Sequence, residues 1–173
     1  MGISRMYWTI RLAGISLAFL AAARIAHAAT PSDGCQLLPK QQVAEVLGKT
    51  VDSATPWALA GKFACMYESD AIPGIDLLVN LIIAGANARH QYEQDVVTLH
   101  NRSPVAGLGD EAAWSSERVK TIVSDRLCML SGPYIVNITF LGSPKVIPSG
   151  NDDLARAHAL AIRVITNAKG AGL

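Results

Sequence analysis

The sequence predicts an α+β domain: an antiparallel sheet with about three helices packed mainly on one face. Two observations carry this prediction. Stretches with helical apolar spacing and runs rich in Val, Ile and Leu follow each other in the order helix, strands, helix, strands, helix. The segments between consecutive strands are too short for crossovers, so neighbouring strands should pair antiparallel. Each half begins with a helix and continues into a hairpin, which indicates a weak internal duplication.

The first helix is predicted from Pro39 to Gly48, because proline suits the first turn of a helix and glycine the position just past its end. Its apolar stripe consists of Val43, Val46 and Leu47. Residues 51–69 follow as two extended pieces joined by a loop at Ala60-Gly61-Lys62. Alternate side chains of the second piece are expected on one face: Phe63, Cys65 and Tyr67.

The middle of the chain predicts one strand and one helix. The run from Ile75 to Ala84, after a turn at Pro73-Gly74, is rich in Val, Ile and Leu and is expected to be a central, buried strand. The helix should run from Asn87, a good capping residue, to about His100. Its apolar positions recur at spacings of four, four and three: Ala88, Tyr92, Val96 and Leu99.

The second half predicts short strands followed by a final helix. The strands are expected at 112–115, 119–123, 127–130 and 134–141, with turns at Ser124-Asp125 and Ser131-Gly132-Pro133. Asn151 is the expected cap of the last helix. The residues that should face inward from this helix are Leu154, Ala157, Ala161, Val164 and Ile165.

The N-terminus predicts a signal peptide over residues 1–28 and export to the periplasm or beyond. Arg5 and Arg11 are followed by an uncharged apolar run from Leu12 to Ala23, which is shorter than the roughly 20 residues of a membrane span. Ala26-His27-Ala28 fits the small-residue pattern of a cleavage site. An uncleaved anchor is the alternative. Cleavage leaves one globular domain, residues 29–173, and no membrane span.

The charge of the exported domain weighs against two classes of partner. Without Arg5, Arg11 and Arg24 the chain keeps 12 basic and 14 acidic residues, with no basic cluster. Affinity for phosphate backbones and anionic membranes needs such a cluster. Nucleic acid is therefore not an expected partner, and neither is a charged membrane surface.

Three cysteines remain after cleavage, and an oxidising compartment should pair two of them. Cys35 and Cys65 are the favoured disulfide, because it would tie a loose N-terminal segment to a strand. Cys128 lies in the apolar stretch 127–130 and is expected to be a buried thiol, although a pairing of Cys128 stays open as the alternative. The spacing of these cysteines supports no metal site.

Four short motifs resemble a known family: Cys35-Gln36-Leu37-Leu38, the stretch from Val43 to Leu47-Gly48, Cys65-Met66-Tyr67, and the run from Val105 to Trp114. Together they resemble small secreted actinobacterial lipoproteins of unknown function, which are related to the extracellular sensor domains of certain mycobacterial serine/threonine kinases. The resemblance implies a disulfide-stabilised α+β domain outside the cytoplasm, with a cleft for a ligand and no catalytic residues. The chain departs from the pattern because its Cys35 is too far from the apolar run to be lipidated.

Candidate site residues are few. Trp57 and Trp114 lie beside expected loops, where an aromatic ring can line a cleft, although either could equally close one end of the core. Asp110 and Glu111 belong to the loop that begins at Gly107, which would form the cleft's edge. That loop lacks the further glycine or lysine of a phosphate-binding loop, and its two acids are too few for calcium.

These observations favour a non-enzymatic binding or sensor-like module without cofactor or metal. No serine-nucleophile motif such as G-x-S-x-G is present, and Cys128 lacks the polar, basic setting of a reactive thiol. The partner is expected to be a small molecule. A protein-interaction role in the cell envelope is the second hypothesis, and a hydrolase with an unrecognised site is the third.

Overall fold

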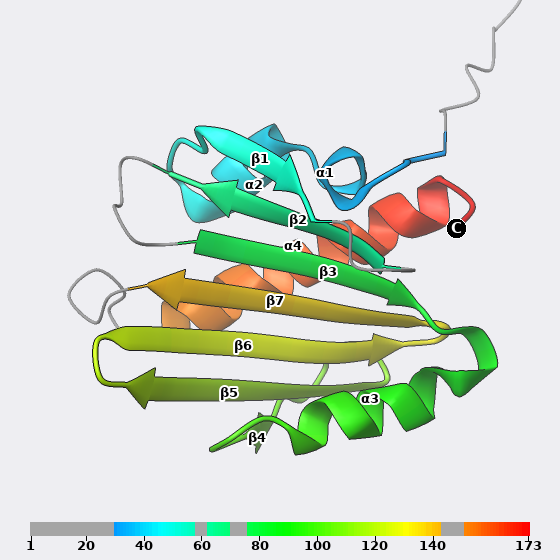
Figure 1. The fold of residues 1–173 in the computed structure, drawn as a ribbon. Coiled ribbons are helices and arrows are strands. Elements are labelled where there is room, and N and C mark those ends of the chain that lie inside the picture. Colours follow the sequence, from blue (N-terminus) through cyan, green and yellow to red (C-terminus); the bar gives the residue numbers. More distant parts are fainter. Residues whose placement is uncertain (1–29, 58–61, 70–75, 143–150) are drawn as a thin grey trace, which may run out of the picture.

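The computed structural model describes residues 30–57, 62–69, 76–142 and 151–173, and within them the chain forms one seven-stranded sheet with helices on both faces (Figure 1). The elements are α1 (Gly34–Leu37), α2 (Lys40–Leu47), β1 (Ser53–Pro56), β2 (Lys62–Glu68), β3 (Asp76–Ile83), a 3-10 turn η1 (Gly85–Asn87), α3 (Ala88–Val97), β4 (Ser103–Pro104), β5 (Glu111–Val119), β6 (Ile122–Ser131), β7 (Tyr134–Gly142) and α4 (Asn151–Gly170).

All neighbouring strands pair antiparallel, in the order β1-β2-β3-β7-β6-β5-β4. The two central strands, β3 and β7, come from different halves of the chain and pair along eight residues. They are the most apolar segments, as expected for strands buried on both faces. The predicted α+β class is therefore confirmed.

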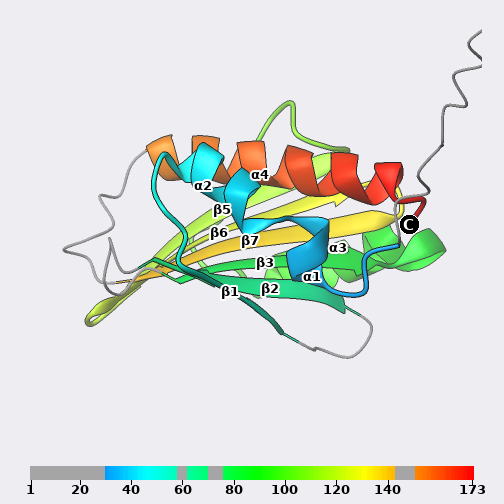
Figure 2. The ribbon, with the colours of Figure 1, turned by 90° about the horizontal axis from the view of Figure 1, so that it is seen from above.

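Of the four helices in the described residues, three cover one face of the sheet. Successive side chains of β6 point to opposite faces of the sheet. Leu127 and Met129 belong to the main core with α4, whereas Cys128 and Leu130 pack with α3 in a smaller cluster. Figure 2 shows α1, α2 and α4 together on one side of the strands. The helices that open the two halves thus lie on opposite faces, so the suggested duplication extends to strand order but not to helix placement.

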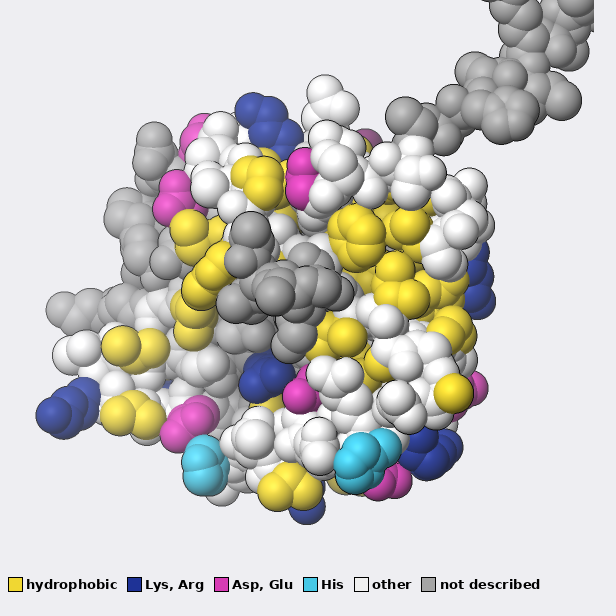
Figure 3. All heavy atoms as spheres, turned by 45° about the vertical axis from the view of Figure 1, so that its right-hand side comes forward, with side chains coloured by type: hydrophobic (Ala, Val, Ile, Leu, Met, Phe, Trp, Pro, Cys, Tyr) yellow, Lys and Arg dark blue, Asp and Glu magenta, His cyan; other side chains and the backbone are white. Residues whose placement is uncertain are grey.

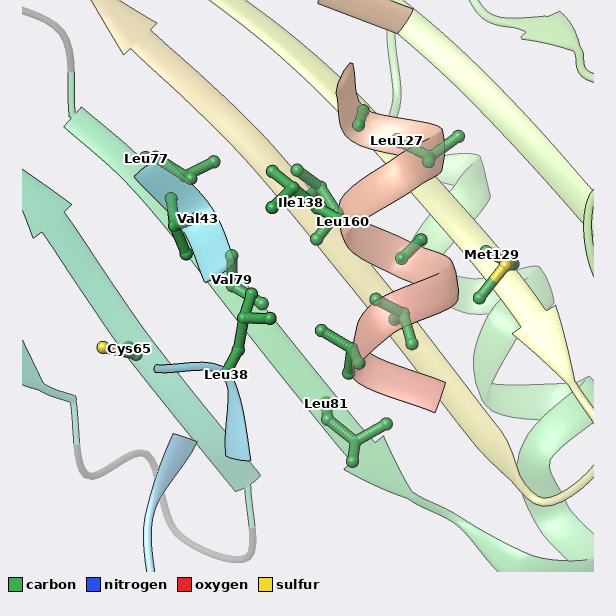
Figure 4. Close-up of a cluster of buried hydrophobic side chains, with 14 of the residues drawn as sticks. Leu38, Val43, Cys65, Leu77, Val79, Leu81, Leu127, Met129, Ile138 and Leu160 are labelled. Carbon is green, nitrogen blue, oxygen red and sulfur yellow. The ribbon is translucent and has the colours of Figure 1, made fainter. Parts of the chain in front are cut away.

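The main core lies between α4 and the central strands (Figure 4). Leu160 of α4 is fully buried and meets Ile138 of β7, while Leu127 and Leu77 bury their side chains from strands on either side. The residues predicted to face inward from the last helix are buried or, for Leu154, half-buried, which confirms that apolar face.

Local signals around the first helix are also confirmed. α2 begins after Pro39 and ends at Leu47, and the following Gly48 caps it in the left-handed conformation (φ +66°) that glycine tolerates best. The disulfide joins Cys35 to Cys65, across 30 positions of sequence, and Cys128 is a free, buried thiol. The Tyr67 hydroxyl donates to the Leu38 carbonyl and holds the α1–α2 junction against β2.

The hairpin between β5 and β6 corrects the strand prediction for residues 119–123. Val119 and Ile122 end the two strands, and the turn between them uses Lys120 at φ +53°. The turn predicted at Ser124-Asp125 instead lies inside β6, where Asp125 is buried and accepts a hydrogen bond from Ser116 of β5. Sheet pairing overrides the turn preference of Ser124 and Asp125, because β6 pairs with β5 on one side and with β7 on the other along this stretch. α3 likewise ends at Val97, three residues before the predicted end.

Residues 1–28 and the predicted turn at Pro73-Gly74 lie outside the described residues, and so does most of the loop predicted at 60–62. Within the part of the chain that the structure describes, no helix combines the length and apolar character that crossing a membrane requires.

Candidate functional site

A groove of about 580 Å³ lies at the β4–β5 edge of the sheet, between the C-terminal half of α3 and the segment 102–113. This volume falls within the range of small-molecule sites. One wall comes from α3. The opposite wall is the loop between β4 and β5 together with the start of β5, and it carries two of the residues that the sequence singled out: Asp110 in the loop and Glu111 at the first position of β5. The groove is therefore the candidate functional site.

The lining of the groove is largely apolar. Tyr92 and Val96 contribute from α3, and Ala113 from β5, because these residues face the same smaller cluster of the sheet. Burial raises the pKa of Tyr92 to about 12, so its hydroxyl stays protonated and can only act as a neutral hydrogen-bonding group at ordinary pH. Leu108 turns inward from the loop and is buried in the main core, which anchors that wall.

Two glycines shape the loop. Gly107 and Gly109 have φ of +75° and +61°, a region that residues with a Cβ rarely adopt. At Gly109 an added Cβ would lie 2.2 Å from the Leu130 carbonyl oxygen, so only glycine permits the loop to touch β6. The Asp110 amide donates to that same carbonyl at 2.8 Å, and the Asp110 carboxylate accepts from the Gly132 amide at 2.6 Å. The loop is therefore a fixed wall.

The rim of the groove is mainly acidic. Glu111 forms an ion pair with Arg89 of α3, and this hydrogen bond raises the pKa of the Arg89 guanidinium. Glu93 is exposed on the same helix. Arg102 is the basic lining residue, and it donates to the Val96 carbonyl at 3.3 Å. A ligand here would meet an apolar floor and an acceptor-rich edge.

The structure does not bring the four sequence-predicted site residues together. Asp110 and Glu111 line the groove. Trp114 lies in β5, opposite Leu127 of β6, and packs against the main core on the other face of the sheet. Trp57 follows β1 at the opposite edge of the sheet, is 46% exposed and lines a separate hollow of about 300 Å³.

Sequence reasoning missed the α3 wall of the groove. Tyr92 and Val96 have the apolar spacing of core residues and do contact the core, so no local signal in the sequence indicates that they also line the groove.

Figure 3 shows one side of the molecule, where hydrophobic side chains gather between dispersed charged groups rather than beside a basic cluster.

Two observations bear on chemistry. Among the described residues no group of three or more His, Cys, Asp or Glu side chains could hold a metal ion. Burial raises the pKa of the Cys128 thiol to about 12, so this cysteine carries almost no thiolate at neutral pH.

These features define an α+β sheet-and-helix domain with an edge groove, and two solved structures have a similar fold. The extracellular domain of PknH from Mycobacterium tuberculosis is similar to it at 10% identity, over 80% of this chain and 97% of that chain, with a TM-score of 0.44. A protein from Bacteroides thetaiotaomicron VPI-5482 is similar at 14% identity and a TM-score of 0.41, over 62% of this chain.

This chain spans only 40% of the Bacteroides chain. No family model and no curated protein matches the sequence. The secreted lipoprotein family that the sequence resembles is matched by none of the comparisons.

Proposed function

We propose that this protein is a non-enzymatic binding module of the periplasmic or extracellular space, which takes a small amphipathic ligand in the groove between α3 and the segment 102–113. The observation that carries the proposal is the groove itself: a ligand-sized hollow with an apolar floor, a rigid glycine-shaped wall and an acidic rim. The apolar part of the ligand lies over Tyr92 and Val96. Its hydrogen-bond donors or positive charge meet the carboxylates of Glu93 and Asp110.

The disulfide supports the proposed compartment. The chain forms a disulfide between Cys35 and Cys65. Disulfides persist in oxidising surroundings and are rare in the cytosol.

The test is ligand screening by amide chemical-shift mapping on the oxidised protein, with a library of small amphipathic amines and neutral amphiphiles. A ligand of the groove shifts signals of α3 and of residues 102–113. Ala106→Trp, which places a large ring in the groove from an exposed lining position, should abolish binding. Ile122→Trp is the matched control, because Ile122 is 57% exposed at the β5–β6 hairpin, outside the groove lining.

Ligands that bind both variants equally well would refute the placement. Native mass spectrometry of protein purified without reductant adds a second readout: a small mass released on denaturation agrees with the proposal. A co-isolated protein chain in its place would favour the interaction role.

A further inference from the structure

Three polar side chains form a cluster on the sheet face opposite α4, and we call them the amide–guanidinium cluster: Asn80 of β3, Asn137 of β7 and Arg126 of β6. Asn80 and Asn137 are direct partners across the two central strands. Arg126 donates from Nη2 to the Asn137 side-chain oxygen at 3.3 Å. Polar residues at the centre of an otherwise apolar sheet are unusual and call for a physical reason.

Two atoms of this cluster are buried without a hydrogen-bond partner. They are Oδ1 of Asn80, a residue only 9% exposed, and Nε of Arg126. Most buried polar atoms in folded proteins are satisfied, so a free acceptor and a free donor on two residues that both neighbour Asn137 indicate groups kept for a partner molecule.

The guanidinium of Arg126 also lacks a carboxylate. The ion pairs among the described residues are Arg89–Glu111, Arg156–Asp153 and Arg163–Glu45, and none involves Arg126. Its neighbour Asp125 points to the other face, where Ser116 donates to it. Asp95 of α3 lies near enough to raise the pKa of Cys128 but forms no ion pair with Arg126.

A continuous row of side chains leads away from Arg126 across this face. In register order it passes through Thr139, Leu78 and Met66, all partly exposed, and reaches Thr55 at the edge. Strands lie about 4.8 Å apart, so Met66 is roughly 14 Å from the backbone of Arg126. The row ends at the hollow of about 300 Å³ that Thr55, Trp57 and Met66 line.

We propose that this face binds a fatty-acid-like carboxylate that carries a hydroxyl or amide N–H near its carboxyl group. Arg126 donates to the carboxylate, because the planar guanidinium matches a carboxylate in geometry and charge. Asn80 Oδ1 accepts from the neighbouring hydroxyl or N–H. The apolar tail lies over Leu78 and Met66 and reaches the hollow beside Trp57, which gives that tryptophan a role separate from the edge groove.

The test compares three probes on the oxidised protein, below their micelle-forming concentrations: 3-hydroxydecanoate, decanoate and methyl 3-hydroxydecanoate. Isothermal titration should rank them in that order, since the second lacks the hydroxyl and the third the charge. Chemical shifts of Asn80, Asn137 and Arg126 should move on binding. No movement at these residues, or equal affinity for acid and ester, would overturn the proposal.

Two variants sharpen the test. Arg126→Gln should weaken binding of 3-hydroxydecanoate roughly ten- to hundredfold, as the loss of a charge-assisted hydrogen bond predicts. Arg118→Gln, an exposed arginine of β5, makes the same charge change and should leave affinity unaltered. Asn80→Leu should erase the preference for the hydroxylated acid. If a variant fails to fold, the acid–ester comparison on the native protein still decides.

This inference does not depend on the proposed groove. Ala106→Trp, which fills the groove, should leave the binding of 3-hydroxydecanoate unchanged. Equal loss of binding in Ala106→Trp and Arg126→Gln would show that the acid occupies the groove, and would refute the sheet-face site.

Discussion

The disulfide offers the most direct quantitative test of how this fold is stabilised. Cys35 belongs to α1, a four-residue helix, and Cys65 to β2. α1 contacts β2 closely: a Cβ on Gly34 would lie 2.6 Å from the Ala64 carbonyl carbon, so this contact excludes any larger residue. Reducing the disulfide should give the unfolded chain more conformational freedom, while the packing of the folded protein stays nearly the same.

The magnitude follows from the 30-residue separation of the two cysteines. Closing a loop of that length lowers the entropy of the unfolded chain by an amount worth about 3.6 kcal/mol at 25 °C. For a domain of this size such a change in the free energy of unfolding shifts the melting temperature by roughly 10 °C.

Thermal denaturation followed by circular dichroism, with and without reductant, measures the shift. The native protein should lose roughly 10 °C on reduction, and the double variant Cys35→Ser/Cys65→Ala should show no response to reductant. Cys128→Ala is the control, because it removes a buried thiol but keeps the disulfide. A full complement of titratable thiols with an unchanged melting temperature would refute the reasoning.

Four further outcomes are expected. Leu160→Ala should lower the free energy of unfolding by about 2–5 kcal/mol in denaturant titrations, because Leu160 is fully buried. Gly109→Ala should destabilise by more than an ordinary surface change and shift the amide signals of Leu130, since its Cβ would collide with that carbonyl. Cys128 should resist a thiol reagent at pH 8 until the protein unfolds, because its pKa is raised to about 12. Burial raises the pKa of the Asp153 carboxyl group. The stability that this group contributes is therefore full below its unfolded pKa of about 3.9 and is lost as the pH rises through its folded pKa. Asp153→Asn should remove this loss, so that the free energy of unfolding changes less with pH across that range.

The candidate site was only half predictable. Asp110 and Glu111 were found because a loop rich in glycine and acid is a local signal, and both line the groove. Tyr92 could not be recognised as a lining residue, since its spacing is that of a core position and it is also buried. Trp114 shows the converse: beside an expected loop it looked available, but its place in β5 turns it toward the main core.

By itself the sequence determined what depends on near neighbours and on apolar spacing. Proline before and glycine after the first helix set its ends, alternation set the inward face of β2, and the apolar spacing of the last helix set its buried side. It also favoured the correct disulfide, because Cys128 sits in an apolar run.

Only the tertiary structure decided which strands become neighbours and which face each helix covers. β3 and β7 pair although more than fifty residues separate them, and this pairing alone places Asn80 beside Asn137. Such contacts depend on long-range packing, which no short window of sequence encodes. Arg126 illustrates the consequence: its neighbours in sequence say nothing of the two amides that make it a candidate carboxylate site.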